Sequence, residues 1–222
     1  MNIKNTLEYV SVLDPYRKNR IVDILKENKI PYSFDIGSNY TNIVITPQCT
    51  DTSKTKMLLT AHYDAVEGSF GANDNGAAIA LLLQLAKYFM FHESKYQIEI
   101  VLFDKEESGH FYGSLGYVTS HVIKNTLFIN FDVIGCGDHI TIVRHDNNLG
   151  IITVDNMRKY NIAEFEFFPP SDAMILNQIG RLNGLEISVF HRKILIINFH
   201  MKFVNTCIMA YMIILNLLIM IL

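Results

Sequence analysis

Three apolar runs that each end on acidic or imidazole side chains constrain this chain more than any other feature. The first run leads into His62-Tyr63-Asp64, the second into Asp104-Lys105-Glu106-Glu107, and the third into Asp132. Short β-rich runs of this kind are typical of strands that are buried on both faces. In an open α/β sheet, ligands bind just outside the carboxyl ends of the strands. Histidine, aspartate and glutamate are ligands suited to zinc, so the sequence predicts a metal site at those ends.

The segments between these runs predict how the strands pair. Residues 77–91 are apolar on nearly all faces, which indicates a helix buried against a sheet. A strand, a helix and a strand that follow in this order imply parallel pairing through a right-handed crossover. We therefore expect one α/β domain, with a mostly parallel mixed sheet and helices on both faces. Further elements are expected as a helix over 15–29 and strands over 40–46, 140–144, 164–168, 186–190 and 194–199.

Length and composition agree with a single globular domain. The chain has 222 residues, of which 50% are hydrophobic and 18% are charged, and this is enough for one substantial core. The formal net charge of −3 gives no electrostatic reason to expect nucleic acid as a partner. The three cysteines, Cys49, Cys136 and Cys207, are an odd number without metal-site spacing, so no disulfide framework is expected. The first residues lack the apolar stretch of a secretory signal, which predicts a cytoplasmic protein.

Two adjacent glutamates carry the strongest single signal for chemistry. Glu106 and Glu107 directly follow a buried strand and would repel each other unless positive charge lies nearby. A divalent cation would supply that charge, so that one glutamate binds it while the other accepts a proton from water. An exposed acidic loop at the start of a helix is the alternative. Taken singly, Asp74 could cap a helix, and the pair His62 and Asp64 could be purely structural.

Arranged in order, four segments resemble the successive motifs of metallopeptidase family 28. They are residues 60–64, residues 71–76, residues 106–109 followed by 113–114, and residues 130–135. The members of this family are co-catalytic di-zinc aminopeptidases, and their relatives include glutaminyl cyclases and some carboxypeptidases. The resemblance covers about residues 40 to 180 and implies the zinc-exopeptidase type of α/β fold.

The resemblance also implies a set of metal ligands for two zinc ions. By it, His62 and Asp132 would hold one zinc, Glu107 would hold the other, and Asp74 would bridge the two. The family gives its second zinc one more histidine, near the C-terminus, usually in a short His…Asp turn. This chain has no turn of that form. His191 and His200 are the nearest candidates, but neither is followed by the expected aspartate.

The remaining roles implied by the resemblance concern the reaction. Glu106 would be the general base, and Asp64 would be the carboxylate that orients the ligating histidine. The expected activity is hydrolysis of the N-terminal peptide bond of a peptide substrate. A cyclase or carboxypeptidase of the same fold is one alternative, and a catalytically impaired, metal-poor relative is another. Ser171-Asp172 resembles a Ser-Asp-His element of the family, but Ala173 stands in place of its histidine.

The last sixteen residues contain no charged side chain. A membrane anchor needs about 20 apolar residues, and Asn216 interrupts this shorter stretch. If the reading frame shifts by one base, the codons of Met209-Ala210 must give glycine and those of Met212-Ile213 must give aspartate, so the missing turn can be restored. We therefore interpret residues 1–206 as a zinc peptidase domain that is incomplete at its C-terminal end, and 207–222 as a frameshifted apolar tail. A true anchor or another apolar end is the alternative, although no membrane partner is expected.

Overall fold

The structure is a computed structural model that describes residues 2–14, 16–47, 53–121, 123–145, 152–190, 213–220 and 222. Its elements follow one another as α1 (Ile3–Val10), α2 (Tyr16–Glu27), β1 (Tyr32–Ile36), β2 (Thr41–Ile45), β3 (Lys56–His62), the turn η1 (Ala72–Gly76), α3 (Ala77–Phe89), β4 (Gln97–Phe103), the turn η2 (Glu106–His110), α4 (Tyr112–Ser120), β5 (Thr126–Phe131), β6 (His139–Arg144), α5 (Val154–Tyr160), β7 (Ile162–Phe165), α6 (Asp172–Gln178) and β8 (Asn183–Phe190).

Within the described residues, the strands form one sheet in the order β1-β2-β4-β3-β5-β8-β6-β7. The four central strands β4, β3, β5 and β8 are parallel to their neighbours in this group. Antiparallel pairs join β1 to β2, β2 to β4 and β6 to β8. The predicted α/β fold with a mostly parallel mixed sheet is confirmed. Because the central strands are parallel, their carboxyl ends lie at one edge, where the acidic and imidazole side chains follow them.

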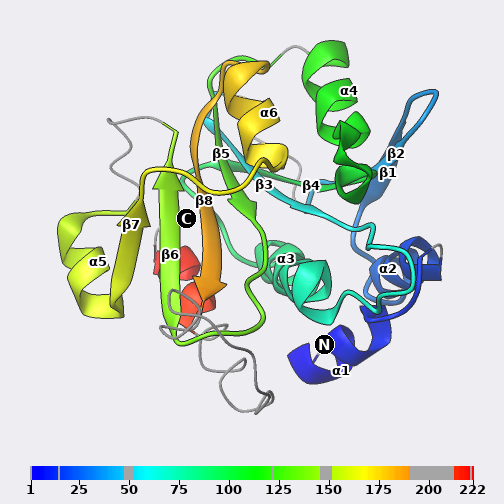
Figure 1. Cartoon of the computed structure of the whole chain (residues 1–222), viewed down its shortest axis with the longest axis horizontal. Coiled ribbons are helices and arrows are strands. Elements are labelled where there is room, and N and C mark those ends of the chain that lie inside the picture. The colour runs from blue at the N-terminus through cyan, green and yellow to red at the C-terminus, as the bar shows by residue number, and fades with distance from the viewer. Residues whose placement is uncertain are drawn as a thin grey trace.

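Helices cover both faces of this sheet (Figure 1). On one face, α3 packs with α1 and α2 in the larger hydrophobic cluster. Ten of its thirteen residues are buried, so the all-round apolar helix predicted from residue 77 onwards is present. On the other face, α4 and α6 pack against Leu58, Val101 and Phe128 in a smaller cluster. Successive strand residues alternate between the two faces, which explains why the strands are continuously apolar.

A row of buried polar side chains crosses three central strands near their carboxyl ends. Thr60 on β3 is paired in register with Asn130 on β5, which is paired with Glu186 on β8. Thr60 Oγ1 donates a hydrogen bond to Asn130 Oδ1 at 2.8 Å, and Asn130 Nδ2 donates to Glu186 Oε1 at 3.4 Å. Burial raises the pKa of Glu186 to about 8. This carboxyl group is therefore mostly protonated at neutral pH.

One predicted strand is displaced. The expectation of a strand over 164–168 is wrong in its bounds, because β7 spans Ile162–Phe165. Phe168 lies beyond the strand, where its ring packs against Phe165 and Phe190 with centroid distances of 6.1 and 5.8 Å. The aromatic residues that suggested a strand therefore contribute ring packing next to Pro169-Pro170, where proline prevents further pairing.

The segment 213–220 is helical and packs against the larger cluster. Three of its side chains are fully buried, namely Ile214, Leu217 and Leu218. The interpretation of 207–222 as a frameshifted tail stays a prediction. The predicted strand over 194–199 lies outside the described residues. Among the helices that the structure describes, none is long and apolar enough to cross a membrane.

Candidate metal centre

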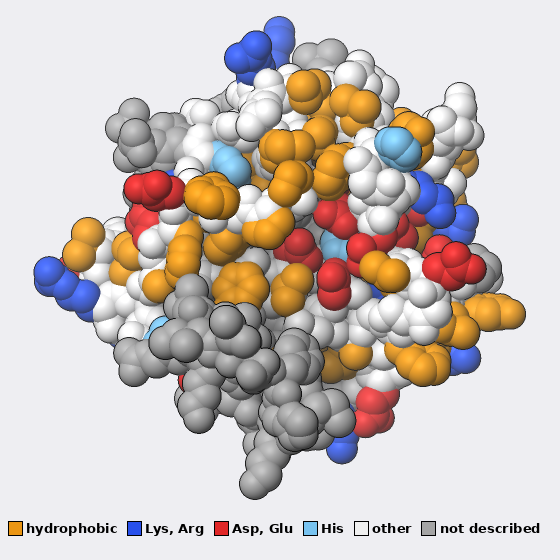
Figure 2. All heavy atoms as spheres, in the orientation of Figure 1, with side chains coloured by type: hydrophobic (Ala, Val, Ile, Leu, Met, Phe, Trp, Pro, Cys, Tyr) orange, Lys and Arg blue, Asp and Glu red, His pale blue; other side chains and the backbone are white. Residues whose placement is uncertain are grey.

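The predicted site residues come together at the carboxyl ends of the central strands. His62 ends β3, Asp74 lies in η1, Glu106 and Glu107 begin η2 after β4, and Asp132 directly follows β5. In the orientation of Figure 1, a space-filling view shows carboxylate side chains gathered around a histidine in a hollow near the middle of the molecule (Figure 2). The surface next to this hollow is rich in hydrophobic side chains.

Three of these residues form what we call the His–Asp group, which consists of His62, Asp74 and Asp132. His62 Nε2 lies 3.0 Å from Asp74 Oδ1 and 3.4 Å from Asp132 Oδ1. Although these atoms are close, none of the three forms a hydrogen bond of acceptable geometry, and all three are buried. The side chain of His62 is only 3% exposed, whereas that of Asp74 is 48% exposed. Water and a substrate therefore have access from the Asp74 side.

The other nitrogen of the imidazole faces Asp64. His62 Nδ1 lies 3.4 Å from Asp64 Oδ1 and 3.2 Å from the Asp64 carbonyl oxygen. Although burial by itself would lower it, the contacts with Asp132, Asp64 and Asp74 raise the pKa of His62 well above its usual value. A proton on Nδ1 leaves the Nε2 lone pair directed at the oxygens of Asp74 and Asp132, which is the tautomer that a metal ligand needs.

The donor set of the His–Asp group fits zinc. Nitrogen and oxygen donors lie about 2.0–2.2 Å from zinc, and tetrahedral geometry then separates two donors by about 3.4 Å. The separation of 3.4 Å between His62 Nε2 and Asp132 Oδ1 equals this value, and that of 3.0 Å to Asp74 Oδ1 is somewhat shorter. The raised pKa of His62 means that, in the metal-free chain, the protonated imidazole itself supplies positive charge between these carboxylates. A zinc ion bound here would take the place of the proton on Nε2.

The second set, which we call the Glu group, consists of His62, Glu106 and Glu107. One oxygen of Asp64 accepts a hydrogen bond from the Glu106 N–H and the other from the Glu107 N–H, each at 3.1 Å. Lys105, which precedes the two glutamates, has a φ of +64° and turns the chain back from the end of β4. Asp64 therefore positions the turn that carries both glutamates as well as the ring of His62.

The environment of the glutamates changes their protonation. Burial raises the pKa of Glu106 to about 8, and this is opposed by His62 but reinforced by the charges of Asp172, Asp132 and Glu107. Burial also raises the pKa of Glu107. A divalent cation beside these groups acts in the opposite direction, because it favours their ionised form. A glutamate with a perturbed pKa in such a place is suited to proton transfer.

The two groups contain one histidine, His62, within the part of the chain that the structure describes. His191 and His200, the candidates for a further ligand, lie outside the described residues. Ala173, in the position of the family's Ser-Asp-His histidine, is fully buried in the smaller cluster. Its neighbour Asp172 is 1% exposed, and burial raises its pKa to about 7.

Sequence reasoning missed two buried residues that support the site. Asn75 is fully buried, and its Nδ2 donates a hydrogen bond to the carbonyl oxygen of Phe131 at 2.9 Å, which joins η1 to the end of β5. Arg17 on α2 is also fully buried, and it donates to carbonyl oxygens of the loop after β3. Asparagine in a turn and arginine in a polar helix are usually exposed, so neither pattern indicated these contacts.

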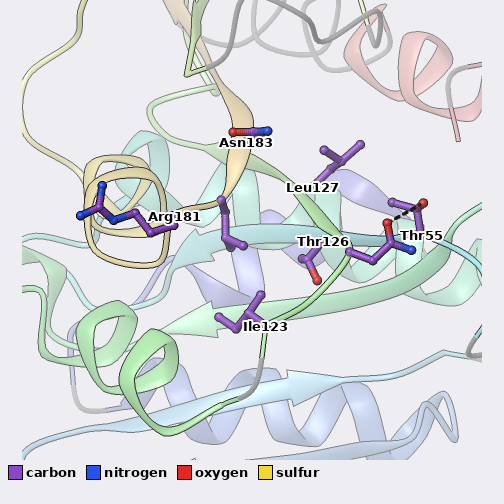
Figure 3. A pocket seen from close by; sticks show the side chains of 8 residues that line it. Thr55, Ile123, Thr126, Leu127, Arg181 and Asn183 are labelled. Carbon is purple, nitrogen blue, oxygen red and sulfur yellow. Dashed lines mark hydrogen bonds between the residues drawn. The ribbon is translucent and has the colours of Figure 1, made fainter.

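A separate pocket of about 430 Å³ lies at the opposite, amino ends of the central strands. Its polar lining includes Arg181, Asn183, and Thr55 hydrogen-bonded to Asn125 at 3.2 Å (Figure 3). Its lining contains neither a carboxylate nor an imidazole. This pocket therefore offers none of the side chains from which the metal centre is built.

The model of Peptidase family M28 matches residues 42–178, a range that includes all six predicted site residues. Among curated proteins, the chain is similar to a vacuolar membrane protease of Candida dubliniensis, with 31% identity over 199 residues that cover 79% of this chain and 21% of that protein. It is also similar to one of Schizosaccharomyces japonicus, with 34% identity over 93 residues, 41% of this chain and 11% of that protein. The chain spans at most about a fifth of the length of these relatives.

Solved structures share the fold. A glutaminyl cyclase of Porphyromonas gingivalis matches with a TM-score of 0.73 and 16% identity, over 99% of this chain and 96% of that chain. A leucine aminopeptidase precursor of Bacteroides thetaiotaomicron matches with a TM-score of 0.72 and 15% identity, over 99% and 93%. A zinc aminopeptidase of Bacillus subtilis matches with a TM-score of 0.64 and 18% identity, over 80% and 49%. At these identities the likeness concerns the fold alone.

The prediction of a cytoplasmic protein is wrong. The curated relatives are named vacuolar membrane proteases, and this name contradicts a cytoplasmic location. The prediction rested on the low apolarity of the first residues alone. That observation carries no information about the parts of the relatives that lie outside the matched region.

Proposed function

Because the chain belongs to peptidase family M28, we propose that it is a zinc-dependent aminopeptidase, which hydrolyses the N-terminal peptide bond of peptides. The observation that carries the proposal is the convergence of His62 Nε2, Asp74 Oδ1 and Asp132 Oδ1 without hydrogen-bond partners, next to the Glu group, which shares His62 and contains Glu106. Family membership supports a peptidase and hydrolase, and the free N-terminus as the target is our inference from the resemblance of the sequence motifs to those of di-zinc aminopeptidases.

In this proposal, different residues of the chain would bind each of two zinc ions. His62 and Asp132 would hold the first ion, Glu107 would hold a second, and Asp74 would contact both. Zinc, when bound, polarises the scissile carbonyl and makes water a nucleophile at neutral pH. Asp64 keeps the proton on His62 Nδ1, so that Nε2 is available as a ligand.

Glu106 performs the proton transfers in this proposal. It accepts the proton of the attacking water and then delivers it to the nitrogen of the departing amine, which becomes a neutral leaving group. Asp74, Asp132 and Glu107 would be neutralised by the zinc ions that they hold, so their charge does not select between the two ends of a peptide. The choice of an aminopeptidase over a carboxypeptidase is supported by the resemblance of the four sequence motifs to those of di-zinc aminopeptidases, and by the likeness in fold to a zinc aminopeptidase.

The experiment uses the purified full chain with a peptide that has a free N-terminus and the same peptide acetylated at the N-terminus. An aminopeptidase releases the first residue of the free peptide only, loses this activity with a zinc chelator, and regains it when zinc is restored. Cleavage of the acetylated peptide from its C-terminus would indicate a carboxypeptidase instead. Conversion of an N-terminal glutamine to a cyclic product without hydrolysis would indicate a cyclase.

A second candidate is a metal-poor relative with little or no turnover. It is favoured by the observation that His62 is the one histidine in both groups of the described chain. Zinc content decides between the two functions. A chain that binds less than one zinc ion and shows no hydrolysis at saturating zinc is the metal-poor relative.

For the location of the protein, we propose the vacuolar membrane, as the name of the curated relatives states for them. Fluorescence of a tagged chain in the organism that encodes it tests this proposal. Signal on the vacuolar boundary is expected, and uniform signal in the cytosol would contradict it.

A further inference from the structure

Arg17 lies on α2, far in sequence from the proposed metal ligands, and its side chain is fully buried. A guanidinium has five N–H groups. Five carbonyl oxygens surround this one, those of Val10, Tyr63, Asp64, Phe70 and Gly71. Nε donates to the first at 3.0 Å, Nη1 to the next two at 3.1 Å each, and Nη2 to the last two at 2.7 and 3.2 Å. This buried cation is therefore satisfied by backbone dipoles, with as many acceptors as it has donors.

Four of these carbonyls lie at the two ends of the loop that joins β3 to η1. Tyr63 and Asp64 begin the loop, and Phe70 and Gly71 end it. Gly71 has a φ of +48°, and a Cβ built on it would lie 2.3 Å from Arg17 Nη2. A side chain at this position would collide with the guanidinium. We call the two ends of this loop, residues 63–64 and 70–71, the neck. Arg17 holds the two sides of the neck together, and Gly71 leaves space for its guanidinium.

Both ends of this neck lead directly to the metal centre. His62 precedes Tyr63, and Asp74 follows Gly71 by three residues. Asp64, whose carbonyl accepts from Arg17, uses its carboxylate to contact His62 Nδ1 at 3.4 Å and to accept the two N–H groups of η2. A displacement of the neck therefore moves groups of both the His–Asp group and the Glu group.

The positive charge of Arg17 also stabilises the metal centre, in addition to its hydrogen bonds. Burial lowers the pKa of Arg17, and the negative charges of Asp14, Asp64, Asp74 and Glu107 oppose that decrease. An arginine stays protonated in proteins, so it places a fixed positive charge behind a cluster of carboxylates. That charge offsets part of their mutual repulsion.

We propose that Arg17 is a positioning residue of the metal centre, which holds His62, Asp64 and Asp74 in place before the metal binds. The proposal rests on the proposed zinc site. A lysine in its place keeps the charge but loses the planar array of five donors, so it cannot hold both ends of the loop. Residues that orient metal ligands typically contribute about 10- to 100-fold to metal affinity.

The test compares Arg17→Lys with the matched control Arg20→Lys in the full chain. Arg20 is on the same helix and lies over the ring of Tyr9 at 4.3 Å. Zinc affinity is measured by competition with a chelator, and the visible absorption of bound cobalt reports the ligand geometry. Arg17→Lys is expected to lower zinc affinity about 10- to 100-fold, with an altered cobalt spectrum, and Arg20→Lys to change neither. A folded Arg17→Lys chain with wild-type affinity and spectrum would overturn the proposal.

Hydrogen exchange of the wild-type chain keeps the proposal testable even if Arg17→Lys fails to fold. The amides of Gly71 and Gly76, which donate to Ser69 Oγ and to the Gly71 carbonyl oxygen, are expected to be protected equally with and without zinc. Protection that arises only when zinc is added would mean that the metal, and not Arg17, orders the loop. A wild-type chain that binds neither zinc nor cobalt would refute the proposed function, while exchange would still decide whether the neck is held.

Discussion

The His–Asp group and the Glu group share His62 and differ in the donors that each has of its own. The His–Asp group draws its carboxylates from two elements and places both oxygens within 3.4 Å of His62 Nε2. The Glu group has two adjacent glutamates of one turn, positioned through their N–H groups by Asp64. Because Nε2 has one lone pair, His62 can complete only one of the groups. We therefore expect a tight ion at the His–Asp group, and proton transfer with a weaker ion at the Glu group.

Replacement of the shared histidine is expected to have the largest effect. In His62→Ala the His–Asp group loses its nitrogen donor, so the affinity for the tight zinc should fall by at least about 100-fold, more than for loss of an orienting residue, and hydrolysis should fall to background. Zinc per chain and rate are measured together. His92→Ala, which removes an exposed ring stacked on Tyr88, is the control and should change neither. Normal zinc content in His62→Ala would show that another residue supplies the donor.

Replacement of the proposed general base, Glu106, distinguishes proton transfer from zinc binding. Glu106→Gln should lower kcat by about 10²- to 10⁴-fold, because the amide cannot accept a proton, while zinc content stays close to that of the wild type. Steady-state kinetics and zinc analysis of the same preparation check this. Loss of zinc in parallel with the rate would show that Glu106 is a ligand and that its role is exchanged with that of Glu107.

One variant in each group tests whether the two groups bind zinc with different affinities. We expect the wild-type chain to bind one zinc tightly and a second one weakly, with low turnover as a consequence. Asp132→Asn should weaken the tight ion about 10- to 100-fold, and Glu107→Gln should affect the weak ion alone. Calorimetric titration of zinc into metal-stripped protein resolves the two events. Two equally tight ions in the wild type would mean that a residue such as His191 or His200 completes the Glu group.

The last prediction concerns a pH dependence of stability that comes from Glu186, outside both groups, where burial and then the charge of Asp132 raise the pKa. The pKa of Glu186 is about 8 in the folded chain against 4.5 for the ordinary side chain, so folding favours its protonated form. Its contribution to stability is present below about pH 4.5 and is lost as the pH rises to about 8, with a slope of at most about 1.4 kcal/mol per pH unit. Urea unfolding of Glu186→Gln between pH 5 and 8, with a chelator present, should show a flatter profile than the wild type. Parallel profiles would contradict this.

The sequence predicted the parts of the site that depend on local pattern. The apolar runs located the ends of β3, β4 and β5, and parallel pairing was enough to bring His62, Glu106 and Asp132 to one edge. It could not predict Arg17 or Asn75, because their partners are backbone carbonyls that only the tertiary fold brings near. Carbonyl groups are the same at every residue, so such contacts leave no trace in a residue pattern.

The buried polar row has a consequence for the register of β5. The register of the central strands places Thr60, Asn130 and Glu186 side by side, close to the edge of the sheet that carries the candidate metal centre. A slip of β5 by one residue would turn Asn130 to the opposite face of the sheet and leave Thr60 and Glu186 without it. Unpaired polar groups in an apolar layer are costly, so a slipped sheet is unstable before any metal arrives. The hydrogen bonds of the polar row therefore favour the observed register of β5, and this register fixes the positions of the side chains that follow the strand ends.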